Sequence, residues 1–267
     1  MMMQMLRSWW LSRGFIWGMV QREFQGRYRR SLLGGVWAVL EPLSMILIYT
    51  LIFSQVMRAK LPGVDLGGWG YSIYICAGIL AWEYFSDVVS RSQNMFIEHG
   101  NLLKKTNLPR STLPVIVLAT ASINFLILLG LFLIFLLMVG QFPGWVLLGL
   151  VPLILVQQGI AVGLGLVLGT LNVFFRDVGK ATMVALRFWF WLTPIVYPIT
   201  IVPERFREAL LDWNPMARLI GGYQGIFLTG NPPDWTEFVP QIVLALGLLG
   251  LGFFAFRRLS GELVDEL

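Results

Sequence analysis

Few side chains in this sequence could support catalysis. The chain has one histidine, His99, and one cysteine, Cys76, too few for a zinc site built from several His and Cys ligands. A Ser-His-Asp triad would depend on His99, and no nucleophile elbow surrounds that residue. Gly179-Lys180 lacks the earlier glycine and the following Ser or Thr of a Walker A phosphate loop. We therefore expect no catalytic residue, no metal ion and no bound ATP in this chain.

One pair of carboxylates keeps an enzymatic alternative open. Glu83 and Asp87 are four residues apart, so a helix would place them on the same face. A membrane-embedded glycosyltransferase or acyltransferase would need such a pair at one membrane face for acid and base chemistry. A transferase is nevertheless the least favoured interpretation of the sequence.

The elements that position these residues must lie in a membrane. The chain has 267 residues, of which 57% are hydrophobic and 13% charged, and its mean hydropathy is +0.72. A soluble domain of this size carries far more charge on its surface. The stretch from Ser111 to Phe175 contains no charged residue at all, whereas a transmembrane β-barrel would alternate polar and apolar positions. The sequence therefore predicts an all-α integral membrane protein.

Hydropathy and turn residues divide the chain into an N-terminal cytoplasmic segment, 1–30, and a transmembrane domain, 31–267. Gly and Pro near residues 140–144 break the long uncharged stretch into two helices. A span needs about 20 apolar residues. The chain offers six stretches of about this length, so six spans are expected. Their predicted ranges are 34–57, 69–88, 112–139, 145–171, 181–200 and 238–256.

The positive charges predict the orientation of these spans. Most of the 20 Lys and Arg residues fall in the N-terminal segment, the loops after the second and fourth spans, and the tail. Because basic residues flanking spans stay in the cytoplasm, both termini should be cytoplasmic. The net charge of +5 then reflects topology and contact with anionic lipid headgroups. It does not require a nucleic-acid partner.

Three segments outside the spans are expected to be helical. Residues 9–25 mix Trp and Arg as an interfacial helix does, although a poorly ordered basic leader is the alternative. Residues 94–107 have the pattern of a short cytoplasmic surface helix. On the outer side, a Pro-initiated helix over 203–213 precedes a second, apolar helix that ends near Gly230.

Three of the charged residues within the predicted spans form a further candidate site. Glu41, Glu83 and Arg187 should lie at similar depths below the cytoplasmic surface. Intramembrane charges are costly unless they are paired or face water, so we hypothesise an ion-paired cluster at the inner mouth of a pathway. A purely structural pair, or an Arg187 side chain that reaches to the interface, explains the same residues equally well.

Aromatic residues are concentrated in the fifth predicted span, which contains Phe188-Trp189-Phe190-Trp191. Aromatic rings stack on flat apolar surfaces with polar rims, and the faces of sugars are such surfaces. A sugar-binding track is therefore one interpretation, and packing between helices and lipid is the more common one.

Five stretches of the sequence form a recognisable set: 27–42, 77–86, 101–114, 171–198 and 214–216. Taken in order, they resemble a known family, the membrane subunits of bacterial polysaccharide ABC exporters that serve O-antigen, capsule and teichoic acid. One departure is Ala81, where many relatives have proline before the tryptophan. The resemblance covers nearly the whole chain on a six-span frame.

This resemblance implies a permease in the bacterial cytoplasmic (inner) membrane that exports a lipid-linked glycan. It implies a homodimer with two copies of a cytoplasmic ATP-binding subunit, which would hold ATP and magnesium. Residues 9–25 become the interfacial helix, 94–104 a coupling helix, and 203–213 with 215–228 a gate. The implied coupling residues are Phe96, Ile97, Glu98, His99, Asn101, Leu102 and Lys104. The implied channel residues are Trp37, Tyr49, Trp82, Tyr84, Phe85, Phe188, Trp189, Trp191 and Tyr197. A type 2 exporter of drugs or lipids shares this frame and is the alternative.

Overall fold

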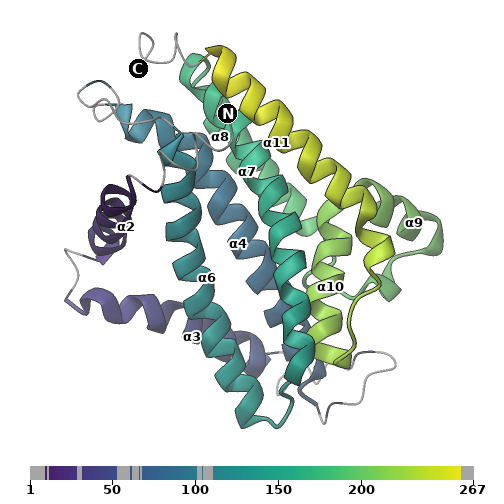
Figure 1. Cartoon of the computed structure of the whole chain (residues 1–267). Helices are drawn as coiled ribbons and strands as arrows, with labels where there is room; N and C mark the ends of the chain where they lie inside the picture. Colours follow the sequence, from purple (N-terminus) through teal and green to yellow (C-terminus); the bar gives the residue numbers. More distant parts are fainter. Residues whose placement is uncertain are drawn as a thin grey trace.

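The computed structural model describes residues 10, 12–28, 32–52, 61, 66, 68–100, 104 and 111–259. Within these residues all regular structure is helical, in agreement with the predicted fold class (Figure 1). The α-helices are α2 (Arg13–Tyr28), α3 (Trp37–Thr50), α4 (Gly70–Glu98), α6 (Thr112–Met138), α7 (Leu150–Phe174), α8 (Asp177–Trp191), α9 (Glu204–Trp213), α10 (Pro215–Thr229) and α11 (Val239–Leu259).

Four helical segments of the described chain are long and apolar enough to cross a membrane. They are Gly70–Glu98, Thr112–Met138, Gly144–Phe174 and Trp235–Leu259. The last two consist of α7 and α11, each with the short 3-10 helix that precedes it. These four correspond to the second, third, fourth and sixth predicted spans.

Helix α4 is longer than predicted. We expected a span over 69–88 and a separate surface helix from residue 94, but one helix of 29 residues continues to Glu98. At a rise of about 1.5 Å per residue it is roughly 43 Å long, longer than the hydrocarbon core of about 30 Å. No Gly or Pro interrupts residues 79–98, and polar side chains such as Arg91 and Gln93 find partners inside the protein.

Helices α3 and α8 are shorter than the spans predicted over 34–57 and 181–200. Helix α3 has 14 residues and α8 has 15; residues 53–57 of the first predicted span lie outside the described residues. Helix α8 stops at Trp191 because the following chain contains Pro194 and Pro198. The irregular backbone after α8 accepts side-chain hydrogen bonds: the hydroxyl of Tyr74 donates to the carbonyls of Pro194 and Tyr197, both at 2.9 Å. Such backbone is tolerated at membrane depth only when it is buried in protein or lines a water-filled space.

Helix α4 forms the centre of the bundle. It packs against α3, α6, α7, α8 and α10, and 83% of its most apolar window is buried, compared with 22% for α6 and α11. Figure 1 shows α4 behind the gap between α6 and α7. Most side chains of α4 are therefore covered by neighbouring helices and do not face lipid.

Helices α7 and α11 pack closely at positions occupied by glycine, Gly163 and Gly252. A Cβ added at Gly163 would lie 2.5 Å from the carbonyl carbon of Leu248, and one at Gly252 would lie 2.6 Å from the carbonyl oxygen of Gly163. Real Cβ atoms do not approach other atoms so closely. Small residues thus let the two backbones touch, as is typical of helix packing in membranes.

The N-terminal segment contains an ordered helix, as one of the two sequence interpretations predicted. Helix α2 lies beside α6 (Figure 1). Val20 is buried and belongs to an apolar cluster with Phe15, Ile16 and Val117. The remaining face, which includes Arg22, is exposed.

The two predicted outer helices also form, as α9 and α10. They differ in burial: the residues of α9 are exposed or half-buried, whereas α10 buries Met216, Ile220 and Tyr223 against the bundle. Helix α10 ends at Gly230, whose φ of 62° places it in the left-handed region that glycine adopts readily.

Candidate functional site: a polar stripe on α4 and its neighbours

One stripe of α4 carries polar groups that face other helices of the bundle. Glu83, Asp87, Arg91, Met95 and His99 follow one another at four-residue intervals. Successive members are neighbours on the helix surface, and the series winds around the helix by about 40° per step. The stripe begins beside α3, passes α6 and ends beside α2.

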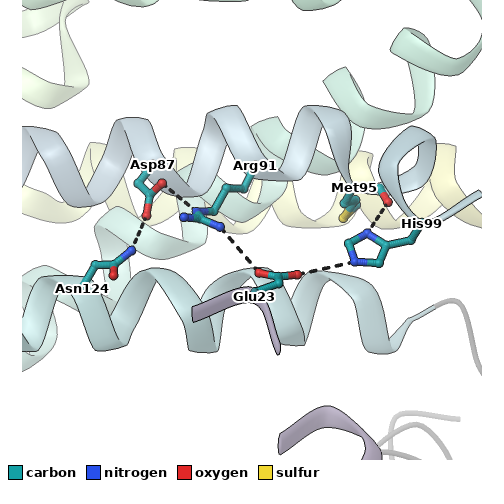
Figure 2. A network of polar contacts seen from close by, with 6 residues as sticks. All are labelled: Glu23, Asp87, Arg91, Met95, His99 and Asn124. Atoms are coloured by element: carbon teal, nitrogen blue, oxygen red, sulfur yellow. Dashed lines mark hydrogen bonds and ion pairs between the residues drawn. The ribbon is translucent and has the colours of Figure 1, made fainter. Parts of the chain in front are cut away.

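The central part of this stripe is a hydrogen-bonded network (Figure 2). Arg91 donates its Nε–H to Oδ1 of Asp87 at 2.7 Å, and Asn124 of α6 donates to Oδ2 of the same carboxylate at 3.2 Å. On its other side, the guanidinium of Arg91 lies 3.5 Å from a carboxylate oxygen of Glu23 on α2. These contacts link three helices through Arg91 and Asp87.

His99 extends the network to the end of α4. Its Nε2 lies 3.5 Å from the other carboxylate oxygen of Glu23, and its Nδ1 lies 3.0 Å from the carbonyl oxygen of Met95. Both neighbours are acceptors, so the arrangement suits an imidazole protonated on both nitrogens. Consistent with this, hydrogen bonding to Glu23 raises the pKa of His99 above its ordinary value of 6.5, although partial burial opposes the shift.

The start of the stripe borders a cavity of about 380 Å³ between α3, α4 and α6. Its polar lining includes Glu41, Glu83, Asp87 and Asn124. The structure therefore places two of the three predicted inner-mouth charges, Glu41 and Glu83, around the same space.

Arg187, the third predicted inner-mouth charge, lies elsewhere. It is exposed on α8, which packs against α4 and α7 and does not border this cavity. Among the described residues, no ion pair within 4.0 Å joins Arg187 to Glu41 or Glu83. The predicted three-residue cluster thus does not form inside one chain, because α8 approaches α4 from another side.

The nine predicted channel aromatics fall into three groups. Those buried within the chain are Trp82, Tyr84 and Phe85; those partly buried are Tyr49, Trp189 and Tyr197; those exposed are Trp37, Phe188 and Trp191. The buried ones pack on other rings: Phe85 meets Trp189 edge to face at 5.3 Å, and Tyr84 stacks on Phe125 at 4.3 Å. For the buried residues, the alternative of helix packing describes what the structure shows.

The predicted coupling residues also differ in how far they are buried. Phe96 is fully buried and stacks on Phe256 of α11 at 5.5 Å, so it does not lie on a docking surface. Its ring is inaccessible in this chain because α4 continues inside the bundle to this point, and its part in coupling stays a prediction. Ile97 and His99 are partly buried, Glu98 and Lys104 are exposed, and Asn101 and Leu102 lie outside the described residues.

Asn172 holds the turn between α7 and α8, which the sequence indicates only through the family resemblance. Its Oδ1 accepts the backbone N–H of Gly179 at 2.8 Å, and its Nδ2 donates to the carbonyl of Gln93 at 3.0 Å. The Gln93 amide in turn donates to the carbonyl of Gly179 at 3.4 Å. One asparagine thereby joins α7, α8 and α4.

Asn214 plays the corresponding part between α9 and α10. Its Oδ1 accepts the indole N–H of Trp189 at 2.8 Å and the N–H of Met216 at 3.1 Å, the second of which caps α10. Its Nδ2 donates to the hydroxyl of Thr193 at 2.9 Å and to the carbonyl of Leu192 at 3.1 Å. The aromatic end of α8 is thus held to the start of α10.

Sequence reasoning missed Glu23, Arg91 and Asn124 as parts of a site. A signal for the α4 members exists in the four-residue spacing of Asp87, Arg91 and His99, which extends the pair of carboxylates at Glu83 and Asp87. Nothing in the sequence indicates that Glu23 faces them, because that contact depends on how α2 packs on α6.

The described residues contain no group of three or more His, Cys, Asp or Glu side chains that could hold a metal ion. The carboxylate of Asp87 already accepts hydrogen bonds from two partners. The arrangement therefore suits the joining of helices and the lining of polar space more than acid and base catalysis.

Comparison with known proteins identifies the family of this chain. The family described as ABC-2 type transporter matches residues 15–228. The chain is a member of this family and a membrane protein with several spans.

Three relatives are named more specifically. An O-antigen export system permease protein, RfbA, from Myxococcus xanthus is 31% identical over 267 residues, covering 100% of both chains. A protein of the same name from Klebsiella pneumoniae is 30% identical over 235 residues, 87% of this chain and 88% of the relative. The polysialic acid transport protein KpsM from Escherichia coli is 23% identical over 246 residues, 89% of this chain and 91% of the relative.

Proposed function

We propose that this chain is the permease subunit of an ABC exporter that moves a lipid-linked polysaccharide across the cytoplasmic membrane. The observation that carries this proposal is the full-length match, at 31% identity, to a protein named as an O-antigen export permease. Membership of the ABC-2 family, whose match spans residues 15–228, supports the transport class independently of that name.

The motor of this exporter is a separate protein. This sequence has no Walker A loop, so ATP and magnesium are held by a cytoplasmic ATP-binding subunit. Two copies of that subunit act on a homodimer of this chain. Closure of the two ATP-binding subunits then shifts the two halves of the membrane bundle relative to each other.

The membrane domain has six spans in this proposal. Four of the spans are the long apolar segments. The other two are α3 and α8, which are only 14 and 15 residues long. Both termini lie in the cytoplasm, and the positive charges at the end of α11, Arg257 and Arg258, support this orientation.

The C-terminal end of α4 and the chain after it contact the ATP-binding subunit. Ile97, Glu98, His99 and Lys104 are at least partly accessible there, and Asn101 and Leu102 belong to the same proposed segment. Phe96 supports this segment through packing within the bundle, because its ring stacks on Phe256 of α11.

The glycan passes along the aromatic side chains that the single chain leaves accessible. Trp37 on α3, with Phe188 and Trp191 on α8, are exposed, and Tyr49, Trp189 and Tyr197 are partly so. Helices α9 and α10 form the outer gate. The bond between Asn214 and Trp189 supports a mechanical connection between this gate and the aromatic end of α8.

The test is to purify the chain from its native membranes in mild detergent and identify what co-purifies. ATP hydrolysis is then measured in proteoliposomes with and without the lipid-linked glycan extracted from the same cells. We expect a stoichiometric Walker A subunit whose ATPase rate responds to the glycan. As a matched control, lipid carrier without its glycan should give no response.

The other outcomes separate the alternatives. An ATPase that ignores glycan but responds to drugs or free lipids indicates a different type 2 exporter. Glycosyl or acyl transfer that needs no ATPase subunit indicates a membrane-embedded transferase. That activity should be lost when Glu83 and Asp87 are changed to Gln and Asn. Either result contradicts the proposed function.

A further inference from the structure

The N-terminal helix is attached to the bundle in two chemically different ways. Its apolar side, with Val20 at the centre, packs on α6 through residues such as Val117. The same apolar cluster includes Met95 and Phe96 of α4. Ion pairs add to this contact: the carboxylate of Glu23 lies 3.5 Å from Arg91 and 3.5 Å from His99. Figure 2 shows Glu23 between these two side chains. In the described part of the chain, the ion pairs that join α2 to α4 are those of Glu23.

These contacts are partly shielded from water. The side chains of Glu23, Arg91 and His99 are between 14% and 22% exposed. They border a cavity of about 310 Å³ whose lining also includes Gly26, Glu98 and Val117. Side-chain contacts across this space add to the apolar packing that positions α2 relative to the end of α4. Ion pairs in such a setting contribute more than fully exposed ones.

We propose that Glu23 is a positioning residue for ATPase coupling: it fastens α2 to the C-terminal end of α4 and so fixes the segment that contacts the ATP-binding subunit. This inference rests on the proposed function. Glu23 does not itself touch ATP, glycan or the partner in this proposal; it acts through Arg91 and His99.

The fastening has a constant part and a pH-dependent part. Arg91 is charged at all relevant pH values, so its pair with Glu23 persists. The pair with His99 requires the imidazolium. Since the pKa of His99 is raised above 6.5 in the folded chain, this part is fully present below about pH 6.5 and is lost as pH rises through the raised value.

Among the residues that the structure describes, few other charged groups act on His99. Glu23 faces it from α2, and Glu98, its neighbour along the chain, also favours its charged form. Arg91 shares the Glu23 carboxylate. From α6, the residue that lines the same cavity is the apolar Val117. The carboxylate of Glu23 is therefore the group whose removal should change both attachment and pH dependence.

The first measurement tests the attachment directly and needs no ATPase. Hydrogen exchange of the amides of α2 is followed in the full-length protein in nanodiscs, and rates are corrected for the intrinsic effect of pH. At pH 6, Glu23→Gln should lower protection over residues 13–28 about threefold to tenfold, the range expected for a partly buried ion pair. Gln21→Ala, at an exposed position of the same helix, is the matched control and should leave protection unchanged.

His99→Gln separates the two parts of the contact. It should lower protection at pH 6 by less than Glu23→Gln does, because the Arg91 pair remains. At pH 9 it should match the natural protein. Glu23→Gln variants that are not monodisperse by size-exclusion chromatography are replaced by Glu23→Asp, whose shorter side chain should give an intermediate loss.

The second measurement tests the role in coupling. The number of ATP molecules hydrolysed per glycan exported is determined in proteoliposomes of the permease with its co-purified ATP-binding subunit. Glu23→Gln should raise this ratio at pH 6 without preventing assembly of the complex, and Gln21→Ala should not.

The results decide the proposal separately from the proposed function. Loss of α2 protection together with a raised ratio supports it. Unchanged protection in Glu23→Gln overturns the attachment, and lost protection with an unchanged ratio overturns the positioning role. If the natural complex shows no glycan-dependent ATPase activity, the proposed function fails and the positioning role fails with it, while the exchange data still decide the contact.

Discussion

Asn214 accepts the indole N–H of Trp189 at 2.8 Å, and this contact ties the end of α8 to the start of α10. The same amide caps α10 and donates to Thr193. It therefore satisfies polar groups at a point where two helices end inside the bundle. Such groups would otherwise be costly to bury.

Replacement of Asn214 should consequently destabilise the part of the protein that contains α9 and α10. Asn214→Ala removes the cap and the partners of Trp189 and Thr193, and we expect a loss of about 2 to 4 kcal/mol in the free energy of unfolding. Thermal unfolding in detergent, followed by tryptophan fluorescence, measures this loss. Asn231→Ala, at an exposed position, should change the midpoint little; equal effects of the two variants would contradict the role given to Asn214.

The glycine contact between α7 and α11 gives a second prediction. Gly163→Ala places a Cβ within 2.5 Å of the backbone of Leu248, so the helices must separate. Overpacking of this kind costs about 1 to 3 kcal/mol. Gly247→Ala, where nothing lies within 4 Å, is the control and should be neutral or slightly stabilising. Heating followed by size-exclusion chromatography of the surviving folded protein compares the two variants.

Tyr74 supports the irregular chain after α8. Tyr74→Phe removes the hydroxyl that reaches the carbonyls of Pro194 and Tyr197. The Pro194 carbonyl keeps the side-chain amide of Gln224 at 3.2 Å, so the main loss is at the carbonyl of Tyr197. Buried carbonyls that lose a partner cost about 1 to 3 kcal/mol, and we expect unfolding to begin at a correspondingly lower temperature. The hydroxyl of Tyr197 donates to Trp191 at an exposed site, so Tyr197→Phe should have a much smaller effect. A reversed order of the two effects would show that this turn is not held by Tyr74.

The pH dependence of stability offers a fourth prediction. Because His99 gains an anionic partner on folding, its raised pKa implies stability that is present below about pH 6.5 and lost as the pH rises through the raised value. The difference in unfolding midpoint between the natural protein and His99→Gln should therefore be largest near pH 6 and disappear by about pH 9. In the background of Glu23→Gln the pH dependence of this difference should be smaller, because only the Met95 carbonyl and Glu98 then favour the imidazolium.

Hydropathy alone located the four long spans, because a run of about 20 apolar residues has few other uses. It failed at the ends of α4 and α8. Polar residues such as Arg91 look like the start of a loop in the sequence, yet here they remain helical because Glu23 and Asp87 neutralise them inside the bundle. The end of α8 was missed because prolines in membrane helices often only bend the chain.

The candidate site was predictable only where the residue type alone is informative. Glu41 and Glu83 are unusual charges for a membrane span, and they do share a cavity. Whether Arg187 joins them depends on the side from which α8 approaches α4, and no pattern in the sequence contains that information. Residue type also suggested a channel position for Trp82 and Phe85, but tertiary packing buries them.

The last prediction separates the buried from the exposed residues of the proposed coupling segment at the end of α4. Phe96→Ala removes a buried ring that stacks on Phe256, and loss of such a ring costs about 3 to 5 kcal/mol, so its folded yield and unfolding midpoint should fall. Lys104→Glu changes an exposed side chain and should leave the midpoint unchanged, since surface substitutions rarely exceed about 0.5 kcal/mol. In the assembled complex, however, it should weaken binding of the ATP-binding subunit, measured by the fraction retained in pull-down at increasing salt. Retention equal to that of the natural protein at every salt concentration would remove Lys104 from the coupling surface.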